Sequence, residues 1–270
     1  MNYYFLPQIP YLQSTVTLAN FPPTTSSSWK SESVYVHATF STGADWKVFF
    51  ILELTSGSTV SLCVEDLPER PTKDSAVFFF MYPKRLPERL DLLPIDHFME
   101  SDPNWRGNIQ LSSKTTSVSY QGEYPGFMLN ISGGTILVFN PLIQSFPGVI
   151  TKLIVANLVR AAEIKVGRLF VICQISGKIE KKFEIETNIC NLIDLSGLKN
   201  DPKDPLCLYS PDMAGIPIFF SHDPSYRLMS LEHSYPPHEF TVFGDNAKRH
   251  GFIKEVKTHW VNSFAKNVSS

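Results

Sequence analysis

Apolar and β-branched residues recur in short runs along the first half of the chain, separated by Gly, Ser, Thr and Pro. Val34–Phe40 alternates β-forming residues, whereas Lys47–Leu54 and Ala76–Tyr82 are nearly continuous apolar runs. Alternation is typical of a half-buried strand, and a short continuous run is typical of a fully buried one. The four residues Thr55–Ser58 connect the second run to Thr59–Val64, which predicts a β-hairpin. These patterns predict antiparallel sheets.

Two later segments have a helical period instead. Residues 151–166 carry Leu153, Ile154, Leu158 and Ala162 on one stripe at a spacing of about 3.6 residues. Thr151 is suited to cap the start of such a helix, and Gly167 is suited to end it. The first predicted helix therefore covers residues 151–166.

The second predicted helix covers residues 247–266, near the C-terminus. Phe252, Val256, Trp260 and Phe264 form an apolar face, and Lys257 lies opposite. Such an amphipathic helix packs on its own sheet or on a second subunit.

The pattern as a whole predicts a mainly β protein, with α+β as the alternative: an antiparallel β-sandwich or barrel, one helix at 151–166 and a C-terminal amphipathic helix. Pro7, Pro10, Pro22 and Pro23 predict an irregular N-terminal arm over residues 1–33. Residues 34–270 are expected to form one globular domain, with a sub-boundary near residue 145 as the alternative.

Two strand-like segments resemble each other. Val48–Gly57 and Leu169–Gly177 both end an apolar run in Ser-Gly. An internal duplication explains this likeness, and so does convergence on one turn chemistry. The second explanation is favoured because Ser and Gly dominate tight turns for backbone reasons.

Composition excludes several classes of protein. The 270 residues are 43% apolar and 19% charged, with 24 Lys+Arg against 26 Asp+Glu and a net charge of −2. This balance is not that of a disordered chain, a basic nucleic-acid binder or a ligand of anionic membranes. The N-terminus lacks the basic region of a signal peptide, so a cytoplasmic protein with no membrane or nucleic-acid partner is expected. The four scattered cysteines are expected to be reduced, buried thiols, and no cofactor is indicated.

Histidines gather near the C-terminus beside carboxylates. The best acid–base pair is His233 with His238, each next to an acidic residue, Glu232 or Glu239. A two-residue hairpin loop at Pro224-Ser225 would leave His222 and His233 about 20 Å apart along the ladder. That distance is too long for a shared ion, so no metal site is predicted, and separate surface histidines are the favoured interpretation.

The surplus of rings, 20 Phe, 10 Tyr and 4 Trp, suits binding because aromatic side chains bury large areas at low entropic cost. Candidate ligand contacts are Trp29, Trp105 and Tyr235 in loops, together with His222 and Arg227. The sequence therefore predicts a binding or assembly protein for a small apolar or sugar-like ligand or a protein partner, with homo-oligomerisation as an option. The alternatives are an enzyme with a barrel-enclosed apolar substrate, or a metal-dependent hydrolase, using the C-terminal histidines.

Overall fold

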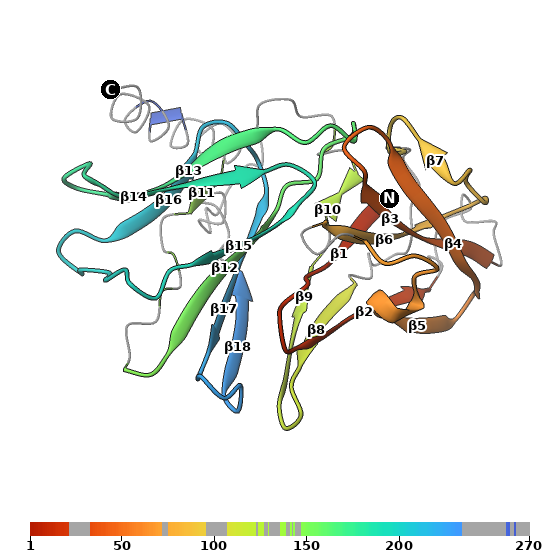
Figure 1. Ribbon diagram of the computed structural model, residues 1–270, viewed down its shortest axis with the longest axis horizontal. Coiled ribbons are helices and arrows are strands. Elements are labelled where there is room, and N and C mark those ends of the chain that lie inside the picture. Colours follow the sequence, from red (N-terminus) through yellow and green to blue (C-terminus); the bar gives the residue numbers. More distant parts are fainter. Residues whose placement is uncertain are drawn as a thin grey trace, which may run out of the picture.

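The computed structural model describes residues 1–21, 33–71, 75–95, 107–122, 124–126, 129, 136–138, 141, 143, 147–233, 258, 259 and 262, and the structural statements below concern these residues. Two groups of strands lie side by side (Figure 1). We call residues 1–126 the N-terminal half and residues 136–233 the C-terminal half. Each half contains two antiparallel sheets.

The N-terminal half comprises sheets A and B. Sheet A has the order β10-β1-β6-β3-β4-β7, formed by Tyr124–Pro125, Asn2–Leu6, Val77–Tyr82, Ser33–Ser41, Trp46–Thr55 and Arg89–Leu90. Sheet B has the order β5-β2-β8-β9, formed by Ser58–Leu62, Gln13–Asn20, Asn108–Ser112 and Ser117–Gln121. A single 3-10 turn, η1 (Val64–Asp66), follows β5.

The C-terminal half comprises sheets C and D. Sheet C has the order β11-β16-β13-β14, formed by Ile136–Val138, Leu206–Ser210, Val166–Cys173 and Ile179–Glu186. Sheet D has the order β15-β12-β17-β18, formed by Cys190–Asp194, Ile150–Ala156, Ile216–His222 and Met229–His233.

The two halves repeat one strand order. In their order across the sheet, β1, β6, β3 and β4 of sheet A correspond to β11, β16, β13 and β14 of sheet C, and sheet B corresponds strand for strand to sheet D. The tight turns that link the two sheets of each half also correspond. Gly57 (φ 77°) donates its N–H to the Asn20 carbonyl at 2.7 Å, and Asn188 (φ 60°) donates its N–H to the Asn157 carbonyl at 2.8 Å. An eight-strand unit therefore occurs twice in this chain.

The likeness between Val48–Gly57 and Leu169–Gly177 is not a trace of this repeat. The first segment lies in β4, whose counterpart is β14, whereas the second begins in β13, whose counterpart is β3. The two segments share a turn chemistry and not a place in the repeat.

Sheet D is buried on both faces, which joins the halves. Leu153 and Phe219 point into the apolar core shared with sheet C, while Ile154 and Phe220 point into the core shared with the N-terminal half. All four side chains are at most 3% exposed. Each Å² of apolar surface removed from water contributes about 25 cal/mol, so burial of this second face stabilises the junction between the halves.

The helix predicted over residues 151–166 is wrong. Residues 150–156 form the strand β12, and β13 begins at Val166. A strand buried on both faces has a continuous apolar run. The spacing of apolar residues alone does not distinguish such a run from a buried helix. The later positions of the stripe, Leu158 and Ala162, are buried because the segment between β12 and β13 packs on the N-terminal half.

Two further sequence expectations differ from the structure. The segment 1–33, expected to be irregular, contributes β1 and β2, and its residues 22–32 lie outside the described residues. Pro7 and Pro10 lie in the connection between β1 and β2 and interrupt neither strand. The hairpin expected from 47–54 and 59–64 is wrong, because β4 pairs with β3 and β5 pairs with β2. The turn at residues 56–57 carries the chain from one sheet to the other.

The prediction of a mainly β, antiparallel protein is confirmed, but none of the four sheets closes into a barrel among the described strands. The C-terminal helix expected over 247–266 lies almost wholly outside the described residues. Only Thr258, His259 and Asn262 are described there, with helical backbone and no defined helix bounds. Among the described residues, none belongs to a helix that could span a lipid bilayer.

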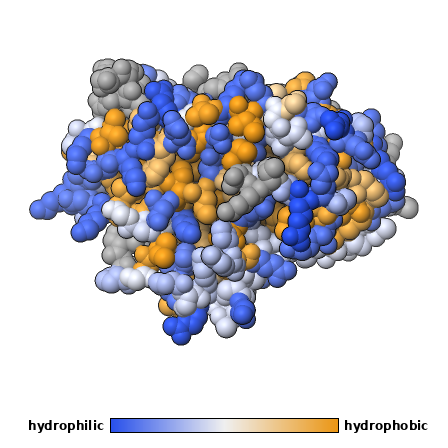
Figure 2. Space-filling view, in the orientation of Figure 1, coloured by the Kyte–Doolittle hydropathy of each residue, from blue (hydrophilic) through white to orange (hydrophobic). Residues whose placement is uncertain are grey.

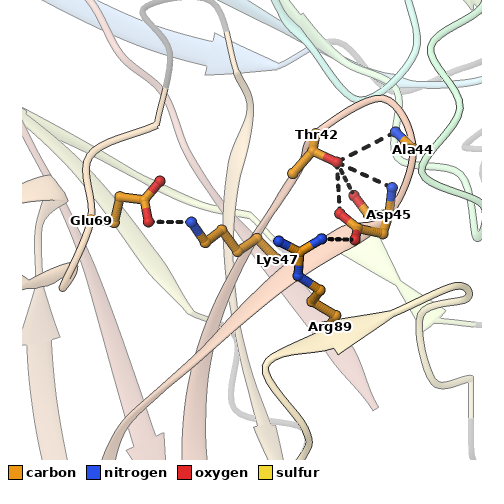
Figure 3. A network of polar contacts seen from close by, with 6 residues as sticks. All are labelled: Thr42, Ala44, Asp45, Lys47, Glu69 and Arg89. Atoms are coloured by element: carbon orange, nitrogen blue, oxygen red, sulfur yellow. Dashed lines mark hydrogen bonds and ion pairs between the residues drawn. The ribbon is translucent and has the colours of Figure 1, made fainter.

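A polar network closes the β3–β4 turn (Figure 3). Thr42 Oγ1 donates to a carboxylate oxygen of Asp45 at 2.7 Å, and Arg89 of β7 donates to the other oxygen at 2.8 Å. The hydrogen bond from Thr42, with Arg89 and Lys47, lowers the pKa of Asp45. Lys47 also pairs with Glu69. This exposed network anchors β7 on the edge of sheet A.

Candidate functional site

A groove of about 930 Å³ lies between the two halves. One wall is the connection between β1 and β2, which continues into the start of β2. The other walls are η1 of the N-terminal half and β15 of the C-terminal half. The lining residues are Leu6, Gln8, Ile9, Pro10, Tyr11, Leu12, Gln13, Ser14, Val64, Glu65, Cys190 and Leu192. The groove thus combines apolar side chains with a few polar ones, as ligand sites commonly do.

Tyr11 is the most exposed large apolar residue of the described chain, at 90%. It is the third residue of a turn closed by the Leu12 N–H and the Ile9 carbonyl at 3.2 Å, with Pro10 at the second position. Its φ is +71°, a value that favours Gly at this position of a Pro-initiated turn. A tyrosine held there costs about 1–2 kcal/mol, and such strain is commonly found at functional sites.

A stack of rings lies in the segment from Phe220 to Tyr226. Burial and the nearby Tyr11 phenol raise the pKa of Tyr226. The Tyr226 ring lies 4.3 Å from that of His222, which in turn lies 4.9 Å from Phe220. Tyr226 also has a positive φ, 55°. Each half therefore contributes one tyrosine with a positive φ, Tyr11 and Tyr226, and the Tyr11 phenol acts electrostatically on Tyr226.

His222, a residue predicted from the sequence to contact a ligand, is only 3% exposed. Its Nδ1–H donates to the Asp223 carbonyl at 2.8 Å, and its Nε2 is buried without a hydrogen-bond partner. Burial lowers the pKa of His222. The ring is therefore neutral at pH 7 and carries an unsatisfied acceptor.

The β17–β18 hairpin exists as predicted, with a longer loop than expected. His222 pairs with Met229 and Ile218 with His233, so six residues separate the strands. Asp223 accepts the Leu228 N–H at 2.8 Å, and its pKa is lowered to about 2, chiefly by that bond. The carboxylate caps the turn, as Asp commonly does.

Bonds between the halves hold this loop. Ser113 Oγ donates to the Tyr226 carbonyl at 2.9 Å, and Thr116 Oγ1 donates to the Arg227 carbonyl at 2.7 Å. Arg227, another predicted contact, is exposed, and its Nε donates to Ser225 Oγ at 3.0 Å. His222 ends β17 and Arg227 lies in the following loop, so both belong to one hairpin, which is attached to the opposite half.

The other predicted site residues are not brought together by the described structure. Glu232 is exposed on β18, and His233 is the last residue of that strand. The partner of His233 in β17 lies four residues from His222, about 13 Å along the ladder. Trp29, Trp105, Tyr235, His238 and Glu239 lie outside the described residues. Within the described ranges, no three His, Cys, Asp or Glu side chains form a group that could hold a metal ion.

The cysteines are free thiols. Cys173 and Cys207 are buried, whereas Cys63 and Cys190 are half-buried. Burial raises the pKa of Cys207 to about 12, and burial with nearby carboxylates raises that of Cys63 to about 11. Neither of these two thiols is a nucleophile at neutral pH.

Sequence reasoning missed Tyr11 and Ser14. Ser14 lines the groove, and its Oγ is buried without a hydrogen-bond partner. The available signal was the Pro10-Tyr11 pair, in which a ring follows a turn-forming proline. The groove itself has no sequence signal, because its walls come from three separate parts of the chain, residues 6–14, 64–65 and 190–192.

Comparison of the chain with protein-family models, with curated proteins and with solved structures gives no match.

One buried histidine lies away from the groove, in sheet A. His37 is fully buried; its Nδ1–H donates to the Tyr35 carbonyl at 3.0 Å, and its Nε2 accepts the Leu86 N–H at 3.2 Å. Burial lowers its pKa from 6.5 to about 4, with Arg85 adding to the effect. Protonation would set a new N–H against the Leu86 N–H, so the folded protein keeps this ring neutral.

We expect His37 to make stability depend on pH. Below pH 6.5 the unfolded chain binds a proton that the folded chain does not bind until about pH 4, so the free energy of unfolding falls as the pH drops through this window. The loss amounts to about 3 kcal/mol at the acid end. Denaturant unfolding at several pH values should show a smaller slope for H37Q than for the wild type. Equal slopes for H37Q and wild type would contradict this assignment.

Proposed function

We propose that this chain is a non-catalytic binding protein, built from two β-sandwich repeats, which holds a small ring-bearing ligand in the groove between its halves. The observation that carries the proposal is Tyr11, an exposed ring held in a strained turn at the groove. A strained, exposed tyrosine is a cost to folding with no packing gain, and a ligand that stacks on it would supply the missing benefit.

The chemistry of the groove favours a ligand with an apolar face and hydroxyl groups, such as a sugar. Ile9, Leu12 and Leu192 offer apolar contacts, while Gln13 and Glu65 offer hydrogen bonds. Flat sugar rings combine both kinds of surface.

The enzyme alternatives depend on His238 and Glu239, which lie outside the described residues, so they stay predictions. Among the described groups, His222 is buried and Glu232 is exposed on another strand. No described pair has the hydrogen-bonded geometry that a general base and its orienting carboxylate require.

Replacement of Tyr11 by Gly tests the proposal, since Gly removes the ring and fits the turn. Titration of maltose and indole, followed by NMR, should show binding of at least one probe by the wild-type protein. We expect Y11G to lower that affinity about tenfold, the value of one aromatic contact of about 1.4 kcal/mol. Its melting temperature should be unchanged or higher because strain is released.

The matched control is L228A, which removes an exposed apolar side chain, 74% exposed, that does not line the groove. It should bind like the wild type. Failure of both probes to bind would contradict the proposed function, and equal affinities for Y11G and wild type would exclude Tyr11 from the site.

A further inference from the structure

The outer edge of β14 is open in the described structure. β14 is the last strand of sheet C and pairs only with β13, whereas its counterpart β4 also pairs with β7 through Trp46 and Lys47. Lys181, Lys182 and Glu184 of β14 are exposed. The β13–β14 hairpin projects at the left-hand end of the molecule in Figure 1, and hydrophilic residues cover that end in Figure 2.

An open edge strand presents unpaired backbone N–H and C=O groups, which form a template for another strand. Side chains then decide which strand fits, because residues directly opposite in an antiparallel pair interact, favourably for opposite charges and unfavourably for like charges. The centre of β14 reads Lys182-Phe183-Glu184, a positive, an apolar and a negative residue in succession. When two copies of this segment run antiparallel, the lysine of each copy lies opposite the glutamate of the other.

We propose that two copies of this chain pair through their β14 edges, antiparallel, around a two-fold axis at Phe183. In a symmetric pair of identical antiparallel strands, one residue faces its own copy and its neighbours face each other crosswise. With Phe183 at the axis, Lys182 faces the partner's Glu184, and Glu184 faces the partner's Lys182. Both charge pairs are favourable.

Other symmetric registers are worse. An axis at any of the charged residues Glu180, Lys181, Lys182, Glu184 or Glu186 sets like charges face to face. An axis at Ile185 sets Glu184 against the partner's Glu186. An axis at Ile179 uses the first residue of the strand, beside the hairpin turn.

The Phe183-centred register has a natural end. If the pairing continued three residues to either side of Phe183, Glu180 would face the partner's Glu186. Glu180, however, is where the β13–β14 register shifts, since Val171 pairs with Lys181 and Ile172 with Ile179. The pairing is therefore limited to residues 181–185.

Packing supports Phe183 as the central contact. Its ring is half-buried against the core of the C-terminal half, and Lys181 Nζ lies 5.0 Å from the ring centre. A second Phe183 across the axis would cover the remaining exposed area. Five paired residues bury a small area, so the dimer is expected to be weak and dependent on concentration.

Charge reversal tests the proposal on the full chain. Sedimentation equilibrium should show a reversible monomer–dimer equilibrium for the wild type. K182E and E184K, each of which opposes like charges, should raise the dissociation constant at least tenfold. The double variant K182E/E184K restores opposite charges and should dimerise like the wild type.

Mixing the two single variants is the sharpest comparison, because glutamates of one chain then face lysines of the other at both positions. We expect the mixture to form a heterodimer although each variant alone is monomeric. Circular dichroism and thermal melting check that the variants fold.

A wild-type measurement guards against misfolded variants. Carbodiimide treatment of mixed ¹⁴N- and ¹⁵N-labelled protein should link Lys182 of one isotope to Glu184 of the other, as seen by mass spectrometry. A wild type that stays monomeric at its highest soluble concentration overturns the proposal. So does a dimer that is unchanged by both single variants and lacks the isotope-mixed link.

Discussion

Replacement of Phe220 by Ala is expected to lower the free energy of unfolding by about 3–5 kcal/mol, the usual cost of deleting a buried phenyl ring. Phe220 is fully buried in the core shared by the two halves, where its ring also stacks on His222. The cavity would open at the junction, so we expect the halves to lose cooperativity as well. Denaturant unfolding followed by hydrogen exchange should show sheets A and B unfolding apart from sheet C.

Its neighbour Phe219 offers a matched control on the same strand. Phe219 is 1% exposed and points into the core shared by sheets C and D. F219A should cost a similar free energy while loosening the C-terminal half first. A loss of less than about 1 kcal/mol for F220A would show that the junction is not packed as described.

Replacement of Asn188 by Ala is expected to cost about 3–5 kcal/mol. The side chain, fully buried, donates to the carbonyls of Ala161 and Glu163 at 3.0 and 3.2 Å and accepts the Val159 N–H at 3.0 Å. Three lost bonds account for about 3 kcal/mol, and Ala at φ 60° adds about 1 kcal/mol of strain.

The loss is expected to spread to the junction, because Asn188 holds the segment 157–165 that packs on the N-terminal half. In that segment the Arg160 carbonyl accepts the Trp46 Nε1–H and the Leu93 N–H, both at 2.9 Å. Thermal melting should therefore show a lower melting temperature, and hydrogen exchange should rise around Trp46.

Two further variants separate the contribution of the lost hydrogen bonds from that of the backbone strain. N188G loses the same bonds but tolerates the positive φ, so it should be about 1 kcal/mol more stable than N188A. G57N places an asparagine at the corresponding turn of the N-terminal half. A Cβ there would meet nothing within 4 Å, so this variant should be tolerated. Equal stability of N188A and wild type would mean that the turn does not position the segment.

Strands β3 and β6 of the N-terminal half were predictable because each carries its own signal, whereas β1 and β2 were not. Ala76–Tyr82 predicted β6, whose residues are all buried, since only a central strand tolerates an unbroken apolar run. Val34–Phe40 predicted β3 from its alternation. Neither pattern said which strand is the neighbour, and the proposed hairpin at 55–58 failed for that reason.

Little of the candidate site was predictable. His222 and Arg227 were singled out from their types, but the strain at Tyr11 depends on the turn, and the groove depends on how the halves pack. Several other candidates, Trp29, Trp105 and Tyr235 among them, lie outside the described residues and stay predictions.

The sequence by itself determined that this chain is mainly β, because a two-residue period and β-branched apolar runs are local properties of consecutive residues. Only the tertiary structure decided that an eight-strand unit occurs twice, since the halves agree in strand order and turn geometry while their side chains differ. It also decided that residues 150–156 are a strand. A short apolar run fits a helix or a strand equally well, and burial of both faces of sheet D selects the strand.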